Sequence, residues 1–252
     1  MFKILYLYIG ENNMPITPAL LQKIQIPEVG RLADYVIQNN RHISPRFLSR
    51  EFLTMQDRYA DRYYDTFCHD AGVMAKCLEQ GKNPELPGVI YSAMCKLTEF
   101  FPRKLEYFAL KGYQVAERNG DFIHMMARLN DLKKVYKNKP DKLMQYIDVL
   151  YGQERCLKEL CYNYDNAIST FRSVSRPPAS RESYYLMLAN TQTELAKLIR
   201  RKYPDQAKKK LLCARNIYSR DRIESPERNR ASIAYIDMNL RKIELVKLIQ
   251  ES

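Results

Sequence analysis

From about residue 45 to the C-terminus, apolar side chains recur every three to four positions, which is the spacing of one face of an α-helix. Short polar breaks that contain proline, asparagine or glycine interrupt this pattern. Runs that alternate apolar and polar residues are scarce, and the chain has only eight glycines for tight turns. We therefore expect an all-α protein, and 252 residues are enough to bury a substantial core.

The apolar spacing and the breaks together predict where the helices lie. The predicted segments are residues 20–24, 29–38, 45–69, 70–80, 88–101, 103–119, 121–137, 140–161, 164–174, 180–202, 204–218 and 226–250. Ser44-Pro45 and Ser225-Pro226 each place a capping side chain before a proline, the favoured order at a helix start. Because the connections are short, neighbouring helices should pack antiparallel.

An internal repeat is visible in the placement of small and large apolar residues. The clearest copy is the run Tyr164-Asp165-Asn166-Ala167-Ile168-Ser169-Thr170-Phe171, followed by Val174 and Pro178. Further copies are Ala71, Ala75, Leu78 and Pro84; Met125, Leu129, Leu132 and Pro140; and Ala207, Leu211 and Ala214. Small residues allow two helices to approach closely, while large ones fill the gap to the next pair. Positions 125, 167 and 207 are about 40 residues apart, which indicates stacked helical hairpins.

This pattern resembles the second half of a tetratricopeptide repeat (TPR), over about residues 103–220. The resemblance implies antiparallel hairpins stacked as a TPR-like α-solenoid, with the long C-terminal helix as a cap. Two features depart from the family: the period is near 40 rather than 34 residues, and Arg155 and Leu195 replace a glycine of the first helix. Other α-solenoids or an irregular helical bundle therefore remain open. By resemblance, a binding groove would be lined by Lys111, Gln114 and Arg118.

The predicted organisation has three regions. Residues 1–43 form an N-terminal extension with short helices, residues 44–102 form a helical region, and residues 103–252 hold the repeats and the C-terminal helix. Met14-Pro15 offers an alternative start, which would make residues 1–13 dispensable. The apolar run at residues 4–9 is too short for a signal-peptide core, and no run approaches the length of a membrane span.

Six scattered cysteines without a CxxC pair indicate reduced core residues of a cytoplasmic protein and exclude a zinc ribbon. The formal charge of +12, from 41 Lys and Arg against 29 Asp and Glu, favours anionic partners such as nucleic acid, acidic protein surfaces or anionic lipid. Most of the 19 tyrosines lie at core-like spacing, with Tyr203 and Tyr218 next to the most basic segment.

Charge is concentrated in residues 197–222, where ten basic residues and two acidic ones leave an excess of +8, two thirds of the total. The predicted ligands for an anionic partner are Arg200, Arg201, Lys202, Lys208, Lys209, Lys210, Arg215, Arg220 and Arg222. Cations at the end of the 180–202 helix also suit its dipole without any partner, at roughly 0.3–1 kcal/mol each. Lys208–Lys210 lie near a helix start, where the dipole disfavours positive charge, so a binding role explains them better.

One catalytic possibility comes from Phe67-Cys68-His69-Asp70-Ala71-Gly72, which resembles the core of the HD-type metal phosphohydrolases. The resemblance implies His42, His69 and Asp70 as metal ligands, with Asp121 or Asp131 as the distant carboxylate. Against it, Asp57, Asp61, Asp65 and His69 follow the i, i+4 spacing of a solvated helix face.

The sequence lacks a phosphate-binding loop, a dinucleotide turn, a Gly-x-Ser-x-Gly motif and an HExxH motif. We therefore predict a non-enzymatic adaptor or scaffold without a cofactor, which binds a protein or peptide partner in a groove or on the basic segment. The alternatives are a nucleic-acid-binding protein that uses the same segment, and the metal phosphohydrolase.

Overall fold

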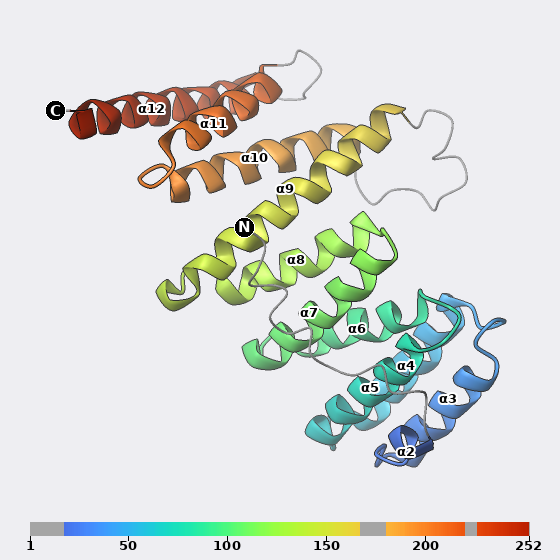
Figure 1. The fold of residues 1–252 in the computed structure, drawn as a ribbon. Helices are drawn as coiled ribbons and strands as arrows, with labels where there is room; N and C mark the ends of the chain where they lie inside the picture. The colour runs from blue at the N-terminus through green and yellow to red at the C-terminus, as the bar shows by residue number, and fades with distance from the viewer. Residues whose placement is uncertain (1–17, 167–179, 220–225, 252) are drawn as a thin grey trace. The chain divides into compact units, whose positions relative to one another are not determined.

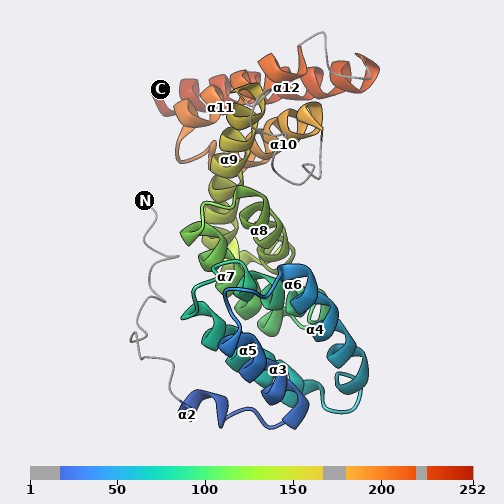
Figure 2. The same cartoon turned by 90° about the vertical axis from the view of Figure 1, so that its right-hand side faces the viewer.

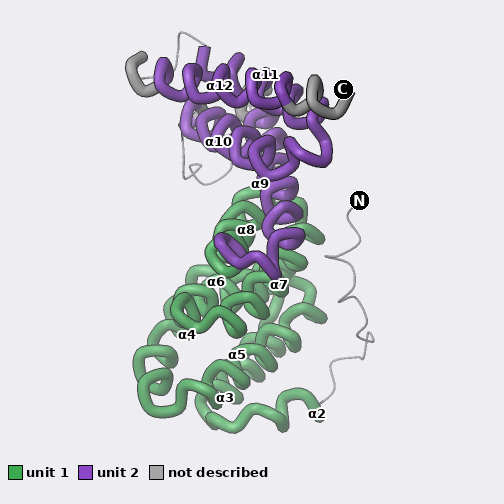
Figure 3. Tube along the Cα trace, turned by 90° about the vertical axis from the view of Figure 1, so that its left-hand side faces the viewer, with its two compact units in different colours: residues 1–135 green, residues 136–252 purple. Residues whose placement is uncertain are grey.

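The computed structural model describes residues 18–166, 180–219 and 226–251 (Figure 1). Within these residues, all regular secondary structure is helical and no strand forms, so the predicted all-α class is confirmed. The chain folds into two compact units, residues 1–135 (unit 1) and residues 136–252 (unit 2) (Figure 3).

Unit 1 holds seven of the described helices, α2 (Pro18–Leu21), α3 (Pro27–Gln38), α4 (Pro45–Tyr59), α5 (Tyr64–Glu79), α6 (Leu86–Leu97), α7 (Pro102–Arg118) and α8 (Phe122–Tyr136), the last ending at the unit boundary. The helix α5 packs against α6, and α6 against α7, while α3 and α4 cover α5 and α6 (Figure 2). The core between them contains fully buried Phe52, Phe67, Met74 and Tyr91.

Unit 2 consists of a short 3-10 helix η1 (Pro140–Lys142), α9 (Leu143–Asn166), α10 (Arg181–Ile199), α11 (Pro204–Tyr218) and α12 (Pro226–Glu251). Each α-helix packs against the next one in the chain: α9 against α10, α10 against α11, and α11 against α12. This neighbour-to-neighbour packing is compatible with a helical repeat.

Helix starts follow the sequence signals closely. The Ser44 hydroxyl accepts a hydrogen bond from the Phe47 amide at 3.1 Å, and Ser180 accepts one from the Ser183 amide at 3.2 Å, so both cap their helices as serine does at this position. Between α7 and α8, Gly120 has φ = +65°, the left-handed conformation that glycine commonly adopts after the end of a helix.

Apart from the exposed closing prolines Pro84 and Pro140, the repeat positions whose side chains the structure describes are buried. Ala71, Ala75 and Leu78 in α5, Met125, Leu129 and Leu132 in α8, and Ala207, Leu211 and Ala214 in α11 are each at most 2% exposed. The copy at residues 164–174 gives a different result. The helix α9 continues through Tyr164 to Asn166, where the sequence predicted a new helix, and Ala167–Val174 lie outside the described residues.

The single helix predicted for residues 45–69 is wrong, because the chain turns between Tyr59 and Tyr64. The turn contains neither proline nor glycine, so the sequence gives no local signal for it. Fully buried Phe52 of α4 and Phe67 of α5 pack with ring centroids 5.4 Å apart across the turn. Tertiary packing of this aromatic pair therefore decides where α4 ends.

Two further predictions concern the region boundaries and the cysteines. The predicted boundary at residues 102/103 falls after the first residue of α7, which packs against α6 within unit 1, whereas the two compact units divide at 135/136. Five cysteines are buried as predicted, but Cys213 is exposed; none of the six, all in the described part, forms a disulfide.

The start of α8 provides a test of stability against pH. An Asp121 oxygen accepts the His124 amide at 3.0 Å, and the other contacts His124 Nδ1 at 2.5 Å. The hydrogen bond to Asp121 raises the pKa of His124. Partial burial would raise the pKa of Asp121, but the hydrogen bonds from His124 outweigh it and hold this pKa low.

We predict that Asp121→Ala lowers the free energy of unfolding by about 1 kcal/mol through loss of the cap. Asp121→Asn should keep the cap and lose only the ion pair, worth a few tenths of a kcal/mol because both side chains are partly exposed. The pKa of His124 is raised on folding. The contribution of the ion pair to stability is therefore fully present below the unfolded pKa of histidine, about 6.5, and is lost as pH rises through the folded pKa of His124. Urea unfolding at pH 6 and pH 9 measures it, and an equal Asn effect at both pH values would contradict the account.

Candidate functional site

The turn between α10 and α11 carries the basic residues predicted to bind an anionic partner. Arg200–Lys202 follow the last turn of α10, and Lys208–Lys210 lie in the second turn of α11. At the other end of this antiparallel hairpin, the Tyr218 hydroxyl donates to Asn190 Oδ1 at 2.6 Å. The two basic groups therefore share one end of the hairpin, because one lies at the end of the first helix and the other near the start of the next. We call this end the basic tip, residues 197–210.

Several of the predicted cations are engaged within unit 2 itself. Three of them contact α12: Arg200 Nη1 donates to Asn239 at 3.2 Å, Lys208 pairs with Glu244 at 3.1 Å, and Arg215 pairs with Asp237 at 2.8 Å. These side chains hold α12 against the α10–α11 hairpin, so they offer less charge to a partner than the sequence suggested.

Lys210 is largely buried and pairs with a carboxylate of another helix. Its Nζ lies 2.5 Å from Glu154 Oε2 on α9, and the two side chains are only 15% and 6% exposed. Lys158 Nζ, at 2.9 Å, and Gln192 Nε2, at 3.3 Å, donate to the other oxygen of Glu154. Burial would raise the pKa of Glu154, but these lysines outweigh it and lower the pKa. Lys210 therefore neutralises a buried carboxylate and is not a surface ligand.

The exposed remainder of the basic tip is small. Arg201, Lys202 and Lys209 are exposed, as is Lys197 on the last turns of α10. Lys202 Nζ lies 5.4 Å from the ring centroid of Tyr203. Within the described part of the chain, these four cations form no ion pair with an acidic side chain. Arg220 and Arg222 lie outside the described residues.

A groove in unit 2, about 490 Å³ in volume, adjoins the basic tip. Its walls come from three helices: Asn190, Thr193, Glu194 and Lys197 of α10, Tyr218 of α11, and Ala231, Ser232, Tyr235 and Ile236 of α12. This groove was not predicted from the sequence. The available signal was the row of polar side chains on α10 at spacing i, i+3, i+4, i+7, which is one face of a helix.

The helices α10 and α12, which form the two main walls of the groove, run in the same direction. Arg200 at the end of α10 contacts Asn239 of α12, and the lining residues Asn190 and Ala231 mark the opposite end. Beyond the groove, exposed Arg201 lies in the turn that follows α10, and exposed Lys242 lies further along α12. Equivalent positions on the two helices are about 40 residues apart, close to the period of the sequence repeat.

The groove has a defined polarity. Glu194, which accepts a hydrogen bond from the Tyr146 hydroxyl, lies toward the C-terminal end of α10. Lys197 follows one turn later, and the cations Arg201 and Lys242 lie beyond it. The polar wall of α10 faces the half-exposed ring of Tyr235, which is 40% exposed. An extended chain in this groove would thus meet an aromatic face and then positive charge.

The groove residues predicted by resemblance lie in unit 1, on α7. Arg118 Nη2 contacts Glu79 Oε2 of α5 at 2.6 Å, and Glu79 also accepts the Tyr91 hydroxyl at 2.6 Å. Lys111 and Gln114 are half-buried on the same helix. Arg118 therefore helps to hold α7 to α5.

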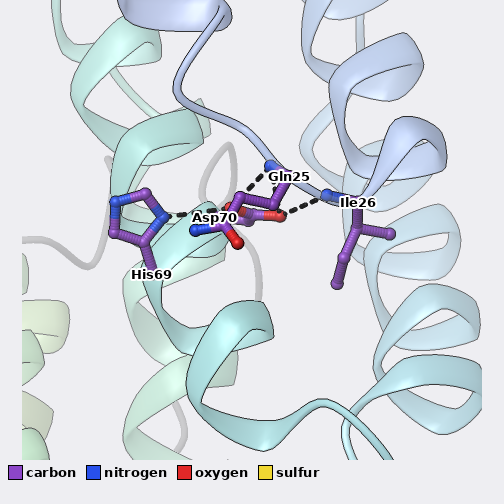
Figure 4. A network of polar contacts seen from close by, with 4 residues as sticks. All are labelled: Gln25, Ile26, His69 and Asp70. Atoms are coloured by element: carbon purple, nitrogen blue, oxygen red, sulfur yellow. Dashed lines mark hydrogen bonds and ion pairs between the residues drawn. The ribbon is translucent and has the colours of Figure 1, made fainter.

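The candidate metal ligands serve local structure (Figure 4). Asp70 is completely buried and accepts the backbone amides of Gln25, at 3.0 and 3.1 Å, and of Ile26, at 2.7 Å, just before α3. His69 Nδ1 contacts the same carboxylate at 3.1 Å. Of the other candidates, His42 is exposed, Asp121 pairs with His124, and Asp131 pairs with Arg128. The described residues contain no group of three or more His, Cys, Asp or Glu side chains arranged to hold a metal ion.

The sequence matches no protein-family model, and neither a curated protein nor a solved structure is significantly similar to it. The TPR resemblance thus rests on the repeat pattern and the helical packing. Among the described helices, none combines the length and apolar character needed to cross a bilayer.

We predict that Asp70→Ala lowers the free energy of unfolding by about 3 kcal/mol. The backbone amides of Gln25 and Ile26 would then lose the carboxylate that accepts their hydrogen bonds. His69→Ala should cost less than about 1 kcal/mol, since this side chain is 48% exposed. Thermal and urea unfolding measure both. Equal losses for the two variants would contradict the structural role assigned to Asp70.

The buried ion pair gives a second stability test. Lys210→Met should cost about 1.5–3 kcal/mol, because it removes a charged hydrogen bond from buried Glu154. The double variant Glu154→Gln/Lys210→Met should recover part of this loss, since no unpaired charge remains. Urea unfolding measures the stability of the two variants. A double variant less stable than Lys210→Met would contradict the pairing of Lys210 with a buried charge on Glu154.

Proposed function

We propose that this chain is a TPR-like helical-repeat adaptor, without enzymatic activity, that binds an acidic segment of a partner protein in the groove of unit 2. The observation that carries the proposal is the groove between α10 and α12, whose walls lead to the exposed cations of the basic tip. A groove of this kind can bind an extended or helical peptide, and the side chains that line it select which peptide binds.

The chemistry of the groove supports a peptide ligand. Thr193, Ser232 and Asn190 offer hydrogen-bonding groups to a main chain, and Tyr235 offers a half-exposed ring to an apolar side chain. Carboxylates of the partner would then lie against Lys197, Arg201 and Lys202. Charge of this kind speeds association and selects the acidic partner more than it adds affinity.

Nucleic acid is the weaker candidate for the same surface. Its binding rests on neutralising a row of phosphates, and affinity rises with the number of cations that are free to do so. Here Lys208, Lys210 and Arg215 pair with carboxylates, which reduces the charge available from the segment.

The variant that tests the proposal must spare the cations that stabilise the fold. Reversing Lys208–Lys210 would place a glutamate at position 210 against buried Glu154 and unfold unit 2 for reasons unrelated to binding. We therefore choose Arg201→Glu/Lys202→Glu/Lys209→Glu, which changes exposed side chains alone. The matched control is Arg41→Glu/Arg46→Glu/Lys82→Glu, with the same change in net charge on exposed residues of unit 1.

We predict that affinity capture from the native cell, with nuclease treatment, returns a protein partner that binds the wild type and the control. The basic-tip variant should lose at least about tenfold in affinity for that partner, as expected when several interfacial charges are reversed. Tyr235→Ala should weaken binding as well. Capture that disappears with nuclease would assign the surface to nucleic acid and overturn the proposal.

A further inference from the structure

One end of unit 1 exposes aromatic side chains to an unusual degree. Phe100, in the turn between α6 and α7, is 88% exposed, and its neighbour Phe101 is 49% exposed. Tyr63, directly before α5, is 54% exposed. Because consecutive helices alternate in direction, the starts of α5 and α7 lie at the same end as the end of α6. We call Tyr63, Tyr64, Phe100 and Phe101 the aromatic tip.

Packing within the tip fixes some of these rings and leaves one projecting. The rings of Tyr64 and Phe101 have centroids 4.8 Å apart, and Lys104 Nζ lies 4.2 Å from the centroid of Tyr64. Lys104 also pairs with Asp65. These contacts hold Phe101 against α5, whereas Phe100 stacks on no other ring in the described part of the chain. Leaving a phenylalanine in water forgoes about 1.5–3 kcal/mol of burial.

Positive charge surrounds the aromatic tip. Arg62, Lys96 and Arg103 are exposed and lie within four residues of the tip in the sequence, as do three exposed acids, Asp61, Asp65 and Glu99. The acids Asp65 and Glu99 are paired with Lys104 and Lys134. The charge left over is therefore positive, at the point where the apolar surface is most exposed.

We propose that the aromatic tip docks onto an anionic lipid bilayer, with Phe100 inserted at the headgroup–acyl boundary and Arg62, Lys96 and Arg103 against the anionic headgroups. Phe100 projects from a turn between two helices, a convex shape that a headgroup layer accommodates directly. Aromatic rings favour the interfacial region, and each nearby cation adds about 1 kcal/mol at an anionic surface. One apolar side chain together with nearby basic residues combines the hydrophobic and electrostatic contributions on which binding to an anionic surface depends.

This surface is independent of the proposed groove, because it lies in the other compact unit and uses none of the same residues. The control variants separate the two. The basic-tip variant Arg201→Glu/Lys202→Glu/Lys209→Glu should still bind vesicles through unit 1, whereas Phe100→Ser should retain the protein partner of the groove.

The absence of tryptophan from the chain makes a direct test possible. Phe100→Trp introduces a single reporter at the tip, and Tyr162→Trp places one at a position of α9 that is 67% exposed. With vesicles of 70% phosphatidylcholine and 30% phosphatidylserine, the emission of the Phe100→Trp protein should shift to the blue. The Tyr162→Trp protein should show no shift, and neither protein should respond to pure phosphatidylcholine.

Co-sedimentation of the full chain with the same vesicles completes the test. Phe100→Ser should reduce binding roughly tenfold or more, the loss expected for one buried phenylalanine. Arg62→Glu/Arg103→Glu should reduce it further, and both variants change exposed side chains. No blue shift at position 100, or sedimentation unaffected by Phe100→Ser, would overturn the proposal and leave the aromatic tip to a protein partner.

Discussion

Unit 2 depends on the packing of α11 among its neighbours. Its small buried residues Ala207 and Ala214, both 0% exposed, allow close approach, and α10 is the helix it packs against most extensively. On another side Lys210 reaches buried Glu154 of α9, and on a third Lys208 and Arg215 bind α12. Because α12 is held in this position beside the hairpin, it forms the second wall of the groove. The proposed binding surface thus arises from the way the helices stack.

The same packing separates two kinds of basic residue that look alike in the sequence. Cations at the buried or facing sides of α11 neutralise carboxylates of other helices, and they contribute to stability. Arg201 and Lys202, in the turn before α11, and Lys209 on α11 are exposed. The excess charge of residues 197–222 is therefore a poor measure of the surface offered to a partner, because a third or more of it is used within the fold.

Local signals predicted most helix boundaries, since caps and prolines act over a few residues. Ser44-Pro45 begins α4, Pro204 begins α11 and Pro226 begins α12, as expected. Features set by distant contacts could not be predicted. The turn after Tyr59 depends on packing across α4 and α5, Lys210 meets a residue 56 positions earlier, and the groove needs two helices about 40 residues apart. The aromatic tip was missed because most tyrosines were expected in the core and Phe100 fell within the predicted 88–101 helix.

Site-specific photo-cross-linking from the groove tests the central claim most directly. A photo-reactive phenylalanine at Tyr235, which lines the groove, is compared with one at Tyr162, which is exposed on α9. Irradiation in the native cell should give a nuclease-resistant protein adduct from position 235 that is absent from position 162. The adduct should fade when Arg201, Lys202 and Lys209 are reversed. An adduct to nucleic acid, or equal protein adducts from both positions, would contradict a peptide-binding groove in unit 2.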